Sequence, residues 1–208
     1  MVNNYDKIAD NYDFLSRLVY GKAQVEAQVN QLKNVPANSR ILVVGGGTGW
    51  ILDEISKIYP SGLTIIYVEL SAKMIEKSKT RSVGYNFIEF INLGIEDFKA
   101  DKSFDVILTP FLFDNFDAKR AGAVFSQLDN VLNKQGSWFM VDFSLNNNRG
   151  RWWKWMLLKL MYVFFKTIGI VEANKLIDMS PYFLNAGYQI CDEQFYFGNF
   201  IKACIYKK

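Results

Sequence analysis

Ile41-Leu-Val-Val-Gly45-Gly46-Gly47-Thr48-Gly49-Trp50 runs directly into Ile51-Leu-Asp-Glu-Ile-Ser-Lys-Ile58. The apolar, β-favouring run before the glycines predicts a short buried strand, and the apolar spacing after them predicts a helix. Glycine allows backbone angles that a Cβ forbids and lets a ligand approach the backbone closely. The N–H groups at the start of a helix favour an anionic group. The stretch therefore predicts a strand, a glycine turn and a helix that together bind a nucleotide-like cofactor.

The spacing of these glycines indicates which cofactor. The dinucleotide fingerprint Gly-x-Gly-x-x-Gly, counted from Gly45, would need a glycine where Trp50 stands. The chain has Gly45-x-Gly47-x-Gly49 instead, which resembles motif I of the class I S-adenosylmethionine-dependent methyltransferases. In that family the loop holds the methionine moiety of S-adenosyl-L-methionine. The resemblance implies cofactor contacts from Gly45, Gly46, Gly47, Thr48 and Gly49, with a purely structural turn as the alternative.

The next predicted strand, Leu63-Thr-Ile-Ile-Tyr-Val-Glu69, ends on a carboxylate. Glu69 lies roughly 20 residues after the glycine turn, where such folds place an acid that accepts hydrogen bonds from the ribose hydroxyls. Glu69-Leu-Ser-Ala-Lys-Met74 resembles the acid-x-Ser-x-x-Met pattern of the same methyltransferases, which implies cofactor contacts from Leu70 and Met74. We expect Ser71 to cap the following helix. The alternative is a strand that merely ends in a solvated acid.

Two further turns resemble motifs of this family. Asn92-Leu-Gly94-Ile95-Glu96-Asp97-Phe98 stands where the family has its adenine-contacting turn, Gly-Asp-Ala-x-x-Leu. Gly94 occupies the position of the acid, so Glu96 or a backbone group of Ile95 is the candidate replacement, and a generic turn is the alternative. Phe104-Asp-Val-Ile107 resembles motif IV, which makes Thr109 and Pro110 at its exit candidate cofactor contacts. Family members that methylate planar amino groups often carry Asn-Pro-Pro-Tyr at this exit, so its absence argues against a nucleobase or glutamine acceptor.

The order of the predicted elements indicates the fold class. Five strand-like segments alternate with helices or turns, which predicts an α/β fold with a doubly wound parallel sheet and ligands at the carboxyl ends of the strands. A helix is predicted over 171–186, and Gly198-Asn199 between two β-rich runs predicts a hairpin. The resemblance extends over essentially the whole chain. It implies a Rossmann-like, doubly wound, seven-stranded sheet that is mostly parallel, with a C-terminal antiparallel hairpin.

The 208 residues, half of them hydrophobic, suffice for one well-packed domain. We expect a single methyltransferase domain, 1–208. Its parts are an N-terminal lid or helix (1–36), a cofactor-binding core (37–148), an apolar helical lid or interface (149–187) and the hairpin (188–208).

The composition bears on three questions: nucleic-acid binding, metal binding and cellular compartment. The net charge of +3 gives no indication of a nucleic-acid surface. Cys191 and Cys204 are isolated and the chain has no histidine, so we expect no metal site and two buried, reduced thiols. The polar start, Met1–Asn11, lacks the apolar core of a signal peptide. These features lead us to expect a cytoplasmic protein.

Candidate acceptor residues lie at the N-terminus and after the fourth strand. The opening Tyr5-Asp6-Lys-Ile8-Ala9-Asp-Asn-Tyr12-Asp13 resembles that of small-molecule methyltransferases, including the ubiquinone/menaquinone-biosynthesis type, in which it caps cofactor and substrate. Tyr5 and Tyr12 are thus candidate lid residues, or anchors of an N-terminal helix. Asp114 and Asn115 are candidate substrate contacts, or caps of the next helix. If the acceptor must lose a proton, Asp114, Tyr12 and Tyr5 are the first bases to test.

The segment Arg149–Lys166 is apolar nearly all round and contains three tryptophans. At ~100° per residue, its basic residues from Arg151 to Lys166 fall within an arc of about 140°. Its lysines argue against a membrane-spanning helix. Three interpretations stay open: a core or homodimer helix, a lid in which Trp153 contacts an apolar substrate, and peripheral membrane contact. The last two favour an apolar acceptor.

The expected function is S-adenosyl-L-methionine-dependent methyl transfer to a small, apolar or aromatic acceptor. A sulfonium already activates its methyl group, so the protein has to position the acceptor and exclude water, without metal or histidine. One alternative is a catalytically silent, cofactor-binding partner subunit. Another is a nicotinamide-dependent oxidoreductase, which Trp50 disfavours.

Overall fold

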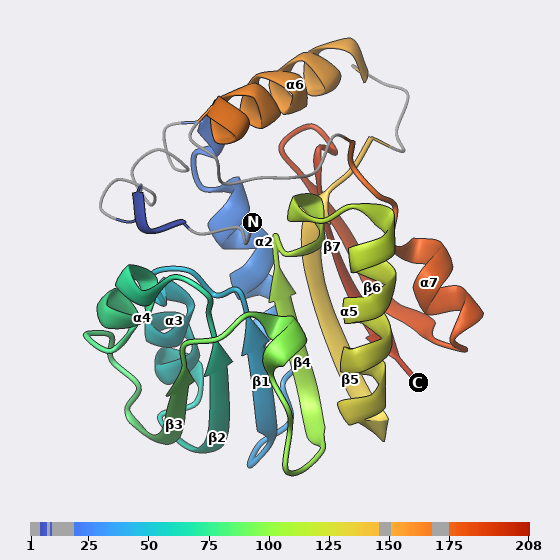
Figure 1. Ribbon diagram of the computed structural model, residues 1–208. Coiled ribbons are helices and arrows are strands. Elements are labelled where there is room, and N and C mark those ends of the chain that lie inside the picture. Colours follow the sequence, from blue (N-terminus) through green and yellow to red (C-terminus); the bar gives the residue numbers. More distant parts are fainter. Residues whose placement is uncertain (1–4, 8, 10–18, 146–150, 168–174) are drawn as a thin grey trace.

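A computed structural model describes residues 5–7, 9, 19–145, 151–167 and 175–208 (Figure 1). Tyr12 lies outside the described residues. The described chain forms a seven-stranded sheet in the order β3-β2-β1-β4-β5-β7-β6. The strands are β1 (Arg40–Val44), β2 (Ser61–Val68), β3 (Tyr85–Ile91), β4 (Phe104–Pro110), β5 (Leu132–Phe143), β6 (Gln189–Tyr196) and β7 (Ile201–Lys207).

Strand directions confirm the predicted fold class. β1 pairs in parallel with β2 and β4, β2 with β3, and β4 with β5. β7 runs antiparallel to both β5 and β6, and β6 and β7 form the C-terminal hairpin. The seven-stranded, mostly parallel, doubly wound sheet is therefore correct. Asn133-Lys-Gln-Gly136, a sequence that predicts a turn before the fifth strand, lies within β5, where the pairing register with β4 shifts between Leu132 and Ser137.

Helices cover both faces of the sheet (Figure 1). The α-helices are α2 (Ala23–Leu32), α3 (Trp50–Ile58), α4 (Ala72–Ser78), α5 (Ala118–Val131), α6 (Arg151–Thr167) and α7 (Ser180–Asn185). Three short 3-10 helices are η1 (Tyr5–Lys7), η2 (Ile95–Asp97) and η3 (Phe113–Asn115). Residues 175–179 are not helical, so the helix predicted over 171–186 is wrong for this part. Pro181 stands in the first turn of α7, a position in which proline is tolerated at a helix start.

Alternate residues of β1 enter two different cores. Leu42 and Val44 pack with residues of α5 and α7, whereas Ile41 and Val43 pack with residues of α2 and α3. Burial of both faces explains the uninterrupted apolar run of this strand.

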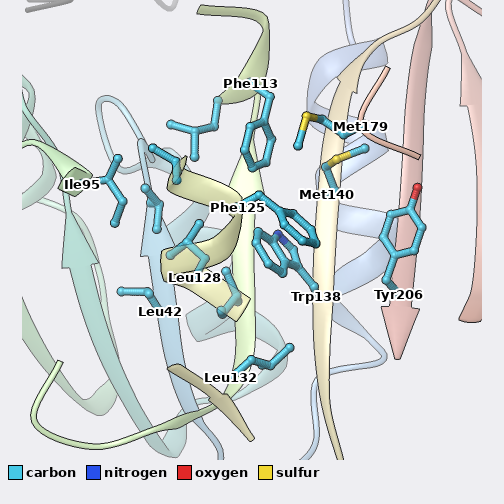
Figure 2. Packing of buried hydrophobic residues seen from close by; sticks show 14 of the residues in the cluster. Leu42, Ile95, Phe113, Phe125, Leu128, Leu132, Trp138, Met140, Met179 and Tyr206 are labelled. Atoms are coloured by element: carbon cyan, nitrogen blue, oxygen red, sulfur yellow. The ribbon is translucent and has the colours of Figure 1, made fainter. Parts of the chain in front are cut away.

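Aromatic rings fill the first of these cores (Figure 2). Trp138 stacks on Phe125, with 5.3 Å between ring centroids, and meets Phe183 edge-on at 4.9 Å. Tyr206 stacks on Phe183 with 3.8 Å between ring centroids. These contacts join α5 and α7 to the centre of the sheet.

The two cysteines differ in exposure. Cys204 on β7 is buried, as predicted, but Cys191 is exposed, so that prediction is wrong. Cys191 belongs to β6, the edge strand, whose residues are mostly exposed or half-buried.

Candidate cofactor and active site

Backbone conformation explains the glycines between β1 and α3. Gly45, Gly47 and Gly49 have φ angles of +68°, +63° and +75°, in the left-handed region that favours glycine. Gly46 is required for a different reason, because a Cβ there would stand 2.4 Å from the Tyr67 hydroxyl oxygen. No heavy atom lies within 4 Å of the corresponding position at Gly47, so the loop leaves open space on that side.

Side chains from β2, from α4 and from the turn after α4 hold this loop in place. The hydroxyls of Tyr67 and Ser78 each lie 3.0 Å from the carbonyl oxygen of Gly47, to which both can donate. Arg81 donates from Nε to the carbonyl oxygen of Thr48 at 2.9 Å. The loop is thus fixed by groups 20 to 33 residues away in sequence.

Glu69 meets the glycine loop directly. Its Oε2 accepts from the Gly47 N–H at 3.0 Å, and its Oε1 accepts from the Ser71 N–H at 2.9 Å. The side chain is only 6% exposed. Burial raises the pKa of this carboxyl, and the backbone N–H groups partly oppose that shift. The acid that directly follows β2 therefore stands beside the glycine turn, as the sequence predicted.

A cavity lies at the carboxyl ends of β1, β2 and β4. It encloses about 1140 Å³ when its open mouth is included. Residues of α2 form part of its wall, so the N-terminal helix faces the same space. The predicted cofactor residues that line it are Gly45, Gly46, Gly47, Thr48, Glu69, Leu70, Met74, Gly94, Ile95 and Pro110.

Three predicted cofactor residues make other contacts. A Cβ at Gly49 would stand 2.7 Å from the Ser78 side chain, so this glycine permits close packing of the loop on α4. Glu96 forms an ion pair with Arg120, which itself lines the cavity and lies over the Phe116 ring. Thr109 is fully buried and accepts a hydrogen bond from Trp138 Nε1 at 2.9 Å.

The adenine-turn prediction is only partly matched by this geometry. Gly94 and Ile95 line the cavity, but the Ile95 carbonyl oxygen already accepts from the Gln127 amide at 2.7 Å. The Glu96 carboxylate is directed to Arg120. The replacement of the missing acid therefore stays a prediction.

Candidate acceptor residues gather next to the cofactor loop. Tyr5 and Asn115 line the cavity, and the Tyr5 hydroxyl donates to Asn115 Oδ1. The Asn115 amide donates to Asp114 Oδ1 at 2.8 Å. Neither Asp114 nor Asn115 caps α5, because Asp117 does so through the Arg120 N–H at 2.8 Å.

Trp153 lies elsewhere in the fold. Its ring meets Phe197 and Phe200 edge-on at 5.8 and 6.0 Å, so it packs α6 against the hairpin of β6 and β7. A role of Trp153 in substrate binding stays a prediction. In contrast, Phe111 lines the cavity with a φ of +49°, a rare conformation for a bulky residue. Such strained residues cluster at functional sites.

Asp114 and Asp142 form a buried pair that the sequence did not indicate. Burial and the Asp142 charge raise the pKa of Asp114 well above its usual range. Burial likewise raises the pKa of Asp142 to about 7. Asp142 Oδ1 accepts from the Phe143 N–H at 2.8 Å. Two carboxyl groups that are buried together favour states in which at least one of them keeps its proton.

Sequence reasoning missed Tyr67, Ser78, Arg81 and Arg120, which hold or line the site. Tyr67 and Ser78 stand in ordinary strand and helix patterns, and Arg81 and Arg120 resemble surface cations. No local signal distinguishes them. For Asp142, the local signal was a carboxylate near the end of the otherwise apolar strand β5.

Comparisons with known proteins agree with this geometry. A family model described as a methyltransferase domain matches residues 41–136. The ubiquinone/menaquinone biosynthesis C-methyltransferase UbiE of Geotalea daltonii is 30% identical over 168 residues, or 77% of this chain and 67% of that protein. UbiE of Geobacter sulfurreducens is 26% identical over 77% of this chain and 62% of that protein. About a third of each relative is therefore unmatched.

Solved structures share the fold. The DhpI–SAH complex superposes with a TM-score of 0.70 at 14% identity and covers 98% of this chain and 92% of that one. The N-methyltransferase NodS from Bradyrhizobium japonicum, in complex with S-adenosyl-L-homocysteine, gives 0.69 at 12% identity, with 97% and 95% covered.

The similarity to UbiE of Geotalea daltonii extends over two thirds of that protein. We conclude that the chain belongs to the class I S-adenosylmethionine-dependent methyltransferases.

Proposed function

We propose that this enzyme transfers a methyl group from S-adenosyl-L-methionine to a small, apolar or aromatic acceptor bound beside the glycine loop. The observation that carries the proposal is the 3.0 Å contact of Glu69 Oε2 with the Gly47 N–H at the cavity wall. This contact places two groups in the same cavity: the Glu69 carboxylate, which would bind the ribose, and the backbone N–H groups of the glycine loop, which would bind the carboxylate of the cofactor.

The residues fit this cofactor. The open space at Gly47 accommodates its amino-acid end, and the Glu69 carboxylate keeps acceptor capacity for a ribose hydroxyl beside its bonds to backbone N–H groups. Leu70, Met74 and Ile95 offer apolar walls for a flat base. When bound, the sulfonium supplies an activated methyl group, so the remaining tasks of the chain are orientation and exclusion of water.

The acceptor side of the cavity is largely apolar. Phe111, Leu112 and Phe116 line it, with Tyr5 and Asn115 as polar groups. We assign Tyr5 and Asn115 to the polar atom of the acceptor, because their side chains are hydrogen-bonded to each other and face the same cavity. The matched relatives are named for C-methylation in ubiquinone and menaquinone biosynthesis, which favours an aromatic acceptor here as well.

Asp114 lies one residue from the cavity wall, and the Asn115 amide contacts it. A direct role as base would require an acceptor proton to reach it past Asn115. We therefore place Asp114 as the group that orients Asn115. Loss of the acceptor proton to solvent, or an acceptor that is already ionised, fits this arrangement without a histidine.

Calorimetric titration of Glu69→Ala with S-adenosyl-L-methionine tests the cofactor site. We expect affinity to fall by about tenfold or more, because hydrogen bonds to a charged group are worth about 1.5–3 kcal/mol. Glu76→Ala on the surface of α4 is the control, since the Glu76 side chain is 71% exposed and pairs only with nearby Lys79 in the described structure. Equal affinities for the wild-type protein and Glu69→Ala would contradict the site.

Two alternative functions, an oxidoreductase and a catalytically silent subunit, can each be tested by a separate measurement. NAD in place of S-adenosyl-L-methionine in the same titration tests a nicotinamide-dependent oxidoreductase. Incubation of the protein with methyl-labelled cofactor and a metabolite extract tests a silent subunit, because transfer of the label requires catalysis. Cofactor binding without any labelled product would favour the silent subunit.

A further inference from the structure

The outer face of α6 is the most apolar exposed surface of any described helix. Six of its large hydrophobic side chains are between 45% and 73% exposed, whereas the other exposed large hydrophobics of the described chain are scattered over several elements. The six are Trp152, Trp155, Met156, Leu160, Val163 and Phe164. Contiguous exposed apolar surface of this kind marks an interaction site.

Contacts on the opposite face fix the orientation of the helix. Leu158 and Tyr162 are buried in a cluster with Phe143 and Phe200. The Tyr162 hydroxyl donates to the Asp114 carbonyl oxygen in η3 at 3.2 Å. The helix therefore lies over the carboxyl ends of the strands (Figure 1). Its other face, which carries the six exposed apolar side chains, is open to solvent.

Positive charge accompanies this face. Lys159 and Lys166 are exposed on it, and the Lys159 ammonium lies 4.7 Å from the centroid of the Trp155 ring. The sequence from 143 to 171 contains no acidic residue. Trp at the boundary, aliphatic side chains on the face and cations beside them are the features of a helix that lies in the interface of a bilayer.

We propose that α6 docks the protein on an anionic lipid bilayer, parallel to the membrane plane, with Trp152, Leu160 and Val163 inserted among the lipids. Lys159 and Lys166 then face lipid phosphates. No described helix is long and apolar enough to cross a membrane, which leaves the interfacial position. Docking would bring the acceptor side of the cavity close to the lipid surface, although it does not itself depend on the proposed methyl transfer.

A second copy of this chain fits the face less well than lipid does. In a two-fold symmetric contact the same patch is used on both copies. Lys159 of both protomers would then enter one apolar interface, and the stretch 143–171 contains no carboxylate to pair with it. Anionic lipid headgroups supply that complementary charge.

Vesicle flotation of the full chain tests the proposal. We expect binding to phosphatidylcholine vesicles that contain about one third phosphatidylglycerol, and weaker binding to phosphatidylcholine alone, because each lysine near an anionic surface is worth about 1 kcal/mol. Leu160→Glu should weaken binding to the anionic vesicles by about tenfold or more, since it removes buried apolar area and adds a negative charge. Lys159→Glu with Lys166→Glu should abolish the preference for the anionic vesicles.

Leu184→Glu on α7 is the matched control, because Leu184 is 56% exposed but lies outside α6. It should bind vesicles as the wild type does. Equal flotation of wild type and Leu160→Glu, or no flotation of the wild type, would overturn the proposal. So would sedimentation analysis that shows a dimer converted to a monomer by Leu160→Glu, because a second copy would then cover the face.

The vesicle experiment can fail or succeed independently of the proposed methyl transfer. Leu160→Glu should retain cofactor affinity in calorimetry, since Leu160 does not line the cofactor cavity. Loss of vesicle binding with intact cofactor binding supports docking through α6. Vesicle binding by a wild-type protein that does not bind S-adenosyl-L-methionine would overturn the proposed function and leave docking supported.

Discussion

At the scale of the residue, each glycine of the loop answers a different physical demand. Gly45, Gly47 and Gly49 supply left-handed backbone angles, and Gly46 makes room for the Tyr67 ring. The glycines were recognisable in the sequence, but the contact that requires Gly46 was not. Tyr67 lies in β2, about 20 residues later, and only the parallel pairing of β1 with β2 brings the two together.

Gly46→Ala is therefore expected to destabilise the protein and weaken S-adenosyl-L-methionine binding. The added Cβ overlaps the Tyr67 ring, and overpacking of this kind costs about 1–3 kcal/mol. Urea unfolding and calorimetric titration measure the two effects. Gly122→Ala in α5 is the control, because its Cβ meets only Tyr182 at 3.4 Å and alanine favours the helix. Unchanged stability of Gly46→Ala would show that the ring can move aside.

At the scale of the element, the exit of β4 shows why a motif position does not fix a role. Thr109 and Pro110 were both predicted to contact the cofactor. Pro110 lines the cavity, whereas Thr109 accepts from Trp138 Nε1 and so joins β4 to β5. Alternation along a strand places neighbouring side chains on opposite faces. The sequence predicted the strand β4. It did not predict that Thr109 would meet Trp138, because that contact depends on the pairing of β4 with β5.

Thr109→Val should lower the free energy of unfolding by about 1–3 kcal/mol, because the buried indole N–H loses its acceptor while the volume stays similar. Cofactor affinity should stay within a factor of about two, since this threonine is part of the core and not of the cavity wall. Urea unfolding and calorimetry provide both numbers. A large loss of affinity with unchanged stability would instead support the original prediction of a cofactor contact.

At the scale of the whole molecule, two carboxyl groups far apart in sequence couple stability to pH. Asp114 and Asp142 are both buried, and both have a raised pKa in the folded protein. In the window from about pH 4 to about pH 7 the folded state keeps a proton on Asp142 that the unfolded state has released. Stability attributable to this group is therefore present at low pH and is lost as the pH rises towards 7.

Asp142→Asn should remove that part of the pH dependence. The loss for one such group is about 1.4 kcal/mol per pH unit within the window, and an asparagine cannot ionise. We expect thermal melts between pH 5 and 8 to show a smaller decline for Asp142→Asn than for the wild type. Asp101→Asn, on the surface beside Arg40, is the control and should keep the decline. Equal declines for wild type and Asp142→Asn would contradict the buried pair.

The sequence by itself determined the α/β class, the glycine loop and the position of Glu69, because hydrophobic period, glycine spacing and strand length are local properties. The fourth and fifth strands, the C-terminal hairpin and the Ser71 cap followed from the same kind of signal. The tertiary structure alone decided the partner of Gly46, the role of Thr109 and the pairing of Asp114 with Asp142. It also decided which face of α6 is exposed, a question that an all-round apolar sequence leaves open. Each of these depends on contacts between side chains that are distant along the chain, and such contacts exist only after the sheet has formed.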